Sequence, residues 1–253
     1  MGANIGVSLF ILNEGVTKAG YLKSEYLSPN VSNDSLTVEG AAPGLLSMPC
    51  EVYYSNDGQY TFLILRSGIV HGRMWPFGFA FTDFVKRCEF RDVSILTGTV
   101  SPVRRGRESN REIPEIYAYV NNHLHKKTKE ENGDKTYYET YGIKKIGHWL
   151  GKDKTRAHQE LEEMSFAGAA KGLMKAFNKH PIPTSLYVIF TPGGIDFVGG
   201  FTYYQFLKNS FKDGVPNQNL GKVTISEESG EEIHKKIFEE KVYKSPAHWK
   251  HII

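Results

Sequence analysis

Two histidines and a tyrosine in the middle of the chain have the types and spacing of a metal-dependent nucleophilic site. His123 and His125 flank one hydrophobic residue, and Tyr141 follows them, close to Lys144 and Lys145. On a strand, alternate side chains share one face, so the two imidazoles could hold one metal ion. A tyrosine hydroxyl nearby could then attack a phosphodiester. One hypothesis is therefore a metal-dependent, phosphodiester-cleaving enzyme that uses His123, His125 and Tyr141.

This short segment resembles the HUH single-strand endonucleases of rolling-circle replication. The resemblance implies that His123 and His125 would hold the metal and that Tyr141 would form the covalent link to DNA. The apolar residues around the histidines, however, recur at three and four and predict a helix over residues 113–129. A spacing of two in a helix separates side chains by about 200°. The alternative interpretation is two solvated histidines at a helix end, with no metal, no cofactor and no catalysis.

A second pattern mixes basic and aromatic residues over residues 101–156. Between residues 101 and 160 the chain has 13 Lys or Arg and 9 Asp or Glu, so much of its formal net charge of +3 is local. Rings stack on bases while cations neutralise phosphates, which suits single-stranded nucleic acid. The candidate contacts are Arg104, Arg105, Arg107, Arg111, Lys144, Lys145, Trp149, Lys152, Lys154 and Arg156. The leading hypothesis is a nucleic-acid-associated binding protein or a subunit of a larger assembly.

The high aromatic content supports a third hypothesis. Aromatic residues make up 13% of the chain, with 14 Tyr, 15 Phe and 3 Trp. Aromatic side chains concentrate at protein interfaces, so an exposed cluster of them would suit a protein–protein interaction module.

The composition indicates an ordinary soluble globular protein. Of the 253 residues 40% are hydrophobic and 23% are charged. The two cysteines, Cys50 and Cys88, cannot form a disulfide framework, and no apolar run approaches the length of a membrane span. A cytoplasmic protein with no membrane partner is expected, and the oligomeric state stays open.

The clearest structural signal is a β-hairpin made by residues 51–54 and 60–65, joined across Asn56-Asp57-Gly58. The unbroken apolar run over residues 62–65 predicts that the second strand is central in its sheet. Further strands are expected over residues 5–12, 74–81, 93–96, 185–190, 195–198 and 222–225.

Helices are expected over residues 113–129 and 154–179 and from Ser229 onward. The fold class is therefore α+β, with a mixed or mainly antiparallel sheet and two to three helices packed on it. We expect a single domain over residues 1–253. Its possible lobes are a β-rich part over residues 1–100 and an α+β part over residues 112–253, joined by a basic loop over residues 101–111.

Overall fold

A computed structural model of the chain describes residues 2–14, 16–30, 32–33, 46–100, 115–146, 168–191 and 197–211. The helices in these ranges are α1 (Gly2–Asn13), α2 (Met74–Arg87), α3 (Asn122–Asn132), α4 (Tyr137–Tyr141), α6 (Gly168–Asn178) and α7 (Phe197–Phe211). The strands are β1 (Thr17–Tyr21), β2 (Ser32–Asn33), β3 (Leu46–Ser47), β4 (Cys50–Tyr54), β5 (Thr61–Leu65), β6 (Val93–Val100), β7 (Ile116–Val120), β8 (Lys144–Lys145) and β9 (Thr184–Thr191). No helix in the described ranges combines the length and apolar character needed to span a bilayer.

Two main sheets form the centre of the fold. One is antiparallel, with the strand order β1-β4-β5, and the other is mixed, with the order β6-β9-β7-β8. In the mixed sheet β9 pairs in parallel with β6 and antiparallel with β7. The α+β fold class predicted from the sequence is confirmed. The described ranges hold six helices, more than the expected two to three, because segments predicted as strands are helical.

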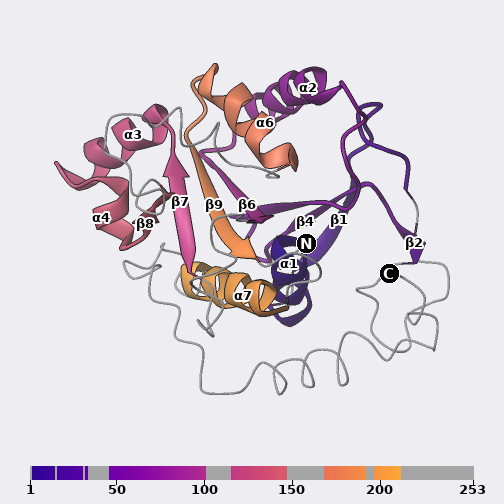
Figure 1. Ribbon diagram of the computed structural model, residues 1–253, viewed down its shortest axis with the longest axis horizontal. Coiled ribbons are helices and arrows are strands. Elements are labelled where there is room, and N and C mark those ends of the chain that lie inside the picture. Colours follow the sequence, from indigo (N-terminus) through magenta and orange to yellow (C-terminus); the bar gives the residue numbers. More distant parts are fainter. Residues whose placement is uncertain are drawn as a thin grey trace.

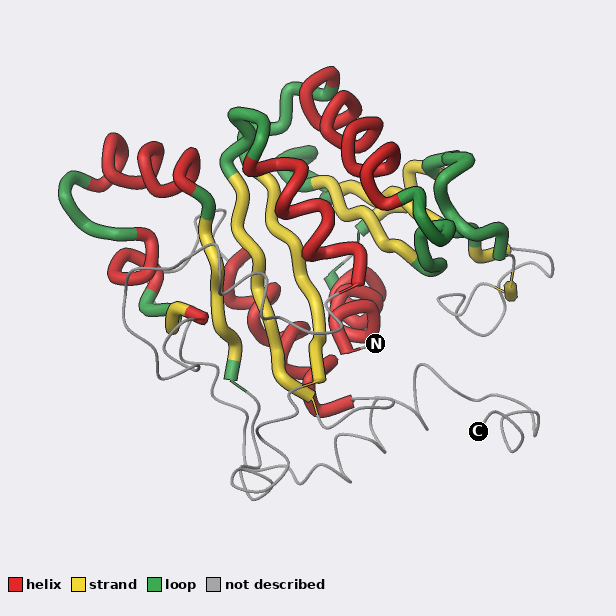
Figure 2. Tube along the Cα trace, turned by 45° about the horizontal axis from the view of Figure 1, so that its top comes forward, coloured by secondary structure: helices red, strands yellow, loops and turns green. Residues whose placement is uncertain are grey.

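Helices cover the sheets on both sides. Figure 1 shows α2 and α6 together on one side and α1 and α7 on the other, while α3 and α4 lie beyond β7. Figure 2 shows the strands of the mixed sheet side by side between these helices. An apolar core therefore lies on each side of the sheets. The face of α2 that points away from its core is at the surface of the molecule.

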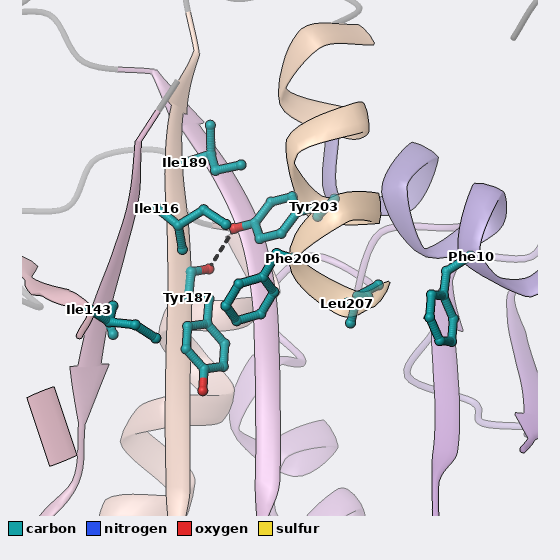
Figure 3. Close-up of a cluster of buried hydrophobic side chains, with 10 residues drawn as sticks. Phe10, Ile116, Ile143, Tyr187, Ile189, Tyr203, Phe206 and Leu207 are labelled. Carbon is teal, nitrogen blue, oxygen red and sulfur yellow. Dashed lines mark hydrogen bonds between the residues drawn. The ribbon is translucent and has the colours of Figure 1, made fainter. Parts of the chain in front are cut away.

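A buried tyrosine of α7 lies in the core between this helix and the mixed sheet. The Tyr203 side chain is fully buried, and its hydroxyl lies 2.7 Å from the Thr97 carbonyl oxygen and 2.8 Å from the Tyr187 carbonyl oxygen. Figure 3 shows Tyr203 and Phe206 of α7 directed at Tyr187 of β9. A buried phenol needs such partners, because an unpaired polar atom in a core is costly.

Residues 5–12 form most of helix α1, so the predicted strand there is wrong. The helix packs closely on α7: a Cβ on Gly6 would lie 2.5 Å from the Tyr203 Cβ and 2.6 Å from the Gly200 carbonyl oxygen. Most of its side chains are buried or half-buried, since Ile11 faces the antiparallel sheet and Phe10 faces the core under α7. An almost wholly apolar segment cannot show the periodicity that identifies a surface helix.

Three other segments also differ from the prediction. Residues 74–81 begin helix α2, where Pro76 is tolerated because the first helical turn needs no amide donor there. The helix expected over residues 113–129 is instead the buried strand β7 followed by helix α3. Phe197 and Val198, expected in a strand, begin helix α7.

The hairpin prediction is confirmed in part. Strands β4 and β5 pair in an antiparallel register that places Tyr54 opposite Thr61 and Cys50 opposite Leu65. However, β5 lies at the edge of its sheet and β4 is central, so the predicted order is wrong. Both faces of β5 are nevertheless packed, with Phe62 and Ile64 on one core and Leu63 on another.

The strands expected over residues 93–96 and 185–190 are confirmed as β6 and β9. The helix expected over residues 154–179 is confirmed where the structure describes it, as α6. The basic loop over residues 101–111, the strand over residues 222–225 and the helix from Ser229 lie outside the described residues.

Candidate protein-interaction surface

Helix α2 has two contrasting faces. One face is in the core and includes Phe77, Phe81 and Val85. The opposite face turns two large rings outward, since Trp75 and Phe79 are each 43% exposed. Their spacing of four places them one above the other, and the rings stack with centroids 6.1 Å apart. Exposed rings stacked in this way form a preorganised apolar surface.

Close packing against α6 fixes the position of α2. A Cβ on Gly78 would lie 3.0 Å from the Ala176 Cβ, and a Cβ on Gly172 would lie 2.4 Å from the Met74 Cε. The two glycines therefore allow the helices to approach closely. This packing brings the residues that follow α6 beside the exposed face of α2.

Two residues after α6 contact the exposed rings. The Lys179 ammonium nitrogen lies 4.5 Å from the centre of the Trp75 ring. His180 meets Phe79 edge-to-face, with ring centroids 6.1 Å apart. Lys86, on the next turns of α2, has its ammonium nitrogen 3.3 Å from His180 Nδ1, which accepts the hydrogen bond.

We call this set the α2–α6 patch, and it consists of Trp75, Phe79, Lys86, Lys179 and His180. Aromatic and cationic side chains together are typical of the energetically important part of protein interfaces. The rings supply apolar area at a low entropic cost, and the ammonium groups supply orientation. The arrangement can bind another macromolecule.

Among the described residues, the other two strongly exposed large hydrophobic side chains do not form a comparable pair. Tyr21 is 47% exposed and lies opposite Glu51, whereas Tyr54 is 43% exposed and lies opposite Thr17. They are at opposite ends of the β1–β4 ladder. Glu51 and Tyr54 are three positions apart on β4, and successive side chains of a strand point to opposite faces. Tyr21 and Tyr54 therefore face opposite sides of the sheet.

The structure places His123 and His125 at the start of α3, not at its end as expected. Their spacing of two separates the side chains by about 200° around the helix, so they do not converge on one ion. His125 packs edge-to-face on Tyr138, with ring centroids 5.4 Å apart. Burial, followed by Lys145 and Lys129, lowers the pKa of His125.

Tyr141 ends helix α4 and packs its ring on Tyr137, with centroids 4.5 Å apart. Burial and then Glu131 and Asp92 raise the pKa of Tyr141, so its phenol holds its proton more tightly than a free tyrosine. A raised pKa opposes the role of nucleophile at neutral pH. Among the described residues no group of three or more His, Cys, Asp or Glu side chains could hold a metal ion.

Of the residues predicted to bind nucleic acid, the structure describes Lys144 and Lys145, which form the short strand β8. The Lys144 ammonium nitrogen lies 2.6 Å from Glu115 Oε1 in an ion pair. The remaining predicted contacts lie outside the described residues; they are Arg104, Arg105, Arg107, Arg111, Trp149, Lys152, Lys154 and Arg156.

The sequence alone does not single out Trp75 and Phe79 as a site. Residues 74–81 read as a strand, and in a strand Trp75, Phe77, Phe79 and Phe81 would all share one face. In a helix the spacing of four separates Trp75 and Phe79 from Phe77 and Phe81. The signal that could have found the patch is therefore this spacing together with the early proline.

Comparisons with known proteins give similarities of fold. No protein-family model matches the chain, and no curated protein matches it. Among solved structures, Pyrococcus furiosus PbaA, described as an archaeal homolog of proteasome-assembly chaperone, is similar with a TM-score of 0.55 and 13% sequence identity. The match covers 92% of this chain and 80% of that one.

A second crystal form of the same archaeal protein gives a TM-score of 0.54 at 13% identity, covering 84% of this chain and 73% of that one. A protein with unknown function from Thermoplasma acidophilum gives a TM-score of 0.52 at 12% identity, with 84% and 72% covered. At such low identities the similarity establishes a shared fold.

Proposed function

We propose that the chain is a non-catalytic protein-binding factor, acting as a subunit or assembly factor of a larger complex. The observation that carries this proposal is the α2–α6 patch, in which Trp75 and Phe79 are stacked, exposed and held in place by α6. Exposed tryptophan in a rigid setting is typical of residues that dominate binding energies. The proposal corresponds to the interaction-module hypothesis from the sequence and to the part of the leading hypothesis that describes a subunit of a larger assembly.

The fold likeness supports the same proposal. Pyrococcus furiosus PbaA is described as an archaeal homolog of proteasome-assembly chaperone. Folds host many functions, so this likeness alone supports only the general class of assembly-related protein binding.

The nucleic-acid hypothesis stays a prediction from the sequence. Eight of its ten residues lie outside the described ranges, and Lys144 pairs with Glu115. Neither the patch nor the fold likeness supports it.

We also propose that residues 1–253 form a single domain. Support comes from contacts between the two halves, since β6 pairs with β9 over eight residues and α1 packs on α7.

The experiment that tests the protein-binding proposal compares capture of cellular proteins by three forms of the full chain. The wild type and a Tyr54→Ala control, whose tyrosine is as exposed as the patch rings, should capture the same protein. A Trp75→Ala/Phe79→Ala variant should lose it, and binding of the purified partner should reproduce the difference. Equal capture by all three forms would overturn the proposed role of the patch.

A further inference from the structure

We infer that the α2–α6 patch binds an acidic segment of a partner protein, with an apolar side chain of that segment on the Trp75 and Phe79 rings. This inference rests on the proposed protein-binding function and specifies the chemistry of the partner. Three observations carry it: the local charge, the position of the ammonium groups beside the rings, and the burial of the remaining apolar face of α2.

Helices α2 and α6 carry more basic than acidic residues. Helices α2 and α6, with the residue after α6, carry one acidic residue, Asp83. They carry five basic residues, Lys86, Arg87, Lys171, Lys175 and Lys179. With Lys179 included, the excess of basic over acidic residues is four, which is larger than the formal net charge of +3 for the whole chain. A surface of this kind attracts carboxylates and repels basic segments.

The cations nearest the rings are available to a partner. No carboxylate in the described ranges forms an ion pair with Lys86, Arg87 or Lys179, whereas Lys126, Lys127 and Lys144 each have such a pair. Lys179 lies on the Trp75 ring, and Lys86 is hydrogen-bonded to His180. Both ammonium groups are therefore held at the border of the apolar surface.

This geometry favours one type of ligand. A carboxylate bound to Lys179 would lie no more than about 7 Å from the centre of the Trp75 ring, because the ammonium nitrogen is 4.5 Å from that centre and a charge-assisted hydrogen bond is about 2.8 Å long. A neighbouring apolar side chain of the same segment could then cover the rings. Binding would combine apolar contact, which supplies affinity, with charge complementarity, which supplies selectivity.

A membrane surface is the competing ligand, since aromatic and basic residues also suit anionic lipids. A helix that lies in a membrane interface buries a broad apolar face there. In α2 that broad face, with Phe77, Phe81 and Val85, is buried in the core. Of the large apolar side chains of α2, Trp75 and Phe79 are the two that are exposed, which fits a localised protein contact better.

The test selects short random peptides from a displayed library on the wild-type full chain, with counter-selection on the Trp75→Ala/Phe79→Ala variant. The expected outcome is a set of patch-dependent peptides enriched in Asp and Glu around an apolar residue. Their affinity should fall about tenfold in a Lys86→Gln/Lys179→Gln variant, because two exposed charge contacts are lost. A Lys126→Gln variant, which removes a lysine that is 81% exposed on α3, should bind like the wild type.

Several results would overturn the inference. These are patch-dependent peptides without an acidic excess, unchanged affinity in the Lys86→Gln/Lys179→Gln variant, or no patch-dependent peptide at all. Patch-dependent sedimentation with vesicles of phosphatidylserine and phosphatidylcholine would assign the surface to lipid instead. If the captured cellular partner depends on Trp75 and Phe79 but not on the two lysines, the proposed function stands and the acidic-segment inference fails.

Discussion

The Lys179 ammonium nitrogen lies 4.5 Å from the centre of the Trp75 ring. Because Lys179 directly follows α6, this contact connects the end of α6 to the exposed face of α2. A cation over an indole face is favourable by about 0.5–1 kcal/mol at an exposed site. This contribution to the stability of the protein is small, so stability alone does not explain why a tryptophan occupies an exposed position. Its main consequence is a defined orientation of the Trp75 ring and of the charge beside it.

Neighbouring aromatic residues of α2 should have very different effects on stability. Trp75→Ala removes a ring that is 43% exposed, so the free energy of unfolding should fall by only about 1 kcal/mol. Phe77→Ala removes a ring that is 1% exposed and should cost about 3–5 kcal/mol. Urea denaturation of both variants measures the difference. Equal losses would show that the Trp75 ring belongs to the core.

The close packing of α1 on α7 predicts a second difference in stability, this time between two glycine-to-alanine variants. Gly6→Ala should destabilise the protein by about 1–3 kcal/mol, because the new Cβ would meet the Tyr203 Cβ and the Gly200 carbonyl oxygen. The better helix propensity of alanine, about 1 kcal/mol, offsets only part of this cost. Gly68→Ala is the control, since no atom lies within 4 Å of its added Cβ. A thermal midpoint unchanged in Gly6→Ala would contradict this packing.

A buried carboxylate should be important for the antiparallel sheet. Glu51 has no exposed surface, and its two carboxylate oxygens lie 2.8 Å from Lys18 Nζ and 2.9 Å from Arg66 Nε. The Tyr53 hydroxyl donates a further hydrogen bond at 3.1 Å. Glu51→Gln should therefore lower the free energy of unfolding by about 3–5 kcal/mol, since it leaves two partly buried cations without their counter-charge.

The matched control for this prediction is Glu131→Gln. Glu131 pairs with Arg91 at 2.7 Å, but both side chains are well exposed. Such pairs contribute about 0–1 kcal/mol, so the loss should be small. A chemical denaturation series in which both substitutions cost the same would refute the structural role assigned to Glu51.

The two cysteines should differ in reactivity and in pH dependence. Cys88 is exposed and should react with iodoacetamide in the native protein, whereas Cys50 is buried and should react only after unfolding. Burial, followed by Glu51, raises the pKa of Cys50 from 9.0 to about 12. Because the folded-state pKa is the higher one, the stability linked to this thiol is complete below pH 9.0. It should be lost progressively between pH 9.0 and about pH 12.

Mass spectrometry of the labelled native protein tests the difference in reactivity. Comparison of the wild type with a Cys50→Ala variant at alkaline pH tests the loss of stability. The native wild type should carry one label, and the variant should lose the part of the alkaline destabilisation that comes from Cys50. Two labels in the native wild type, or the same alkaline response in both proteins, would contradict the burial of this thiol.

Local chemistry was sufficient to predict some elements. The Asn56-Asp57-Gly58 turn between two apolar segments specifies the β4–β5 hairpin without help from the rest of the fold. The central strand β9, an apolar run of strand length, was identified in the same way. The α+β class followed from these elements and from the amphipathic part of α6.

The errors arose where tertiary burial removes the periodic signal. Strand β7 lies between β9 and β8 and is buried at every position, so its apolar residues also fit a helical spacing. Helix α1 is covered by α7 and by the sheet, and it therefore resembles a buried strand. The candidate site depends on α2 and α6 together, and the closeness permitted by Gly78 and Gly172 is a property of the fold.

The central claim is that Trp75 and Phe79 form a protein-binding surface. The most direct measurement is the dissociation constant, by isothermal titration, of the full-length wild type, Trp75→Ala/Phe79→Ala and Tyr54→Ala for the purified protein that the wild type captures. We predict that the double variant binds at least about 30-fold more weakly, as loss of a central aromatic contact implies. Tyr54→Ala should bind like the wild type. Equal dissociation constants for the wild type and the double variant would contradict the account.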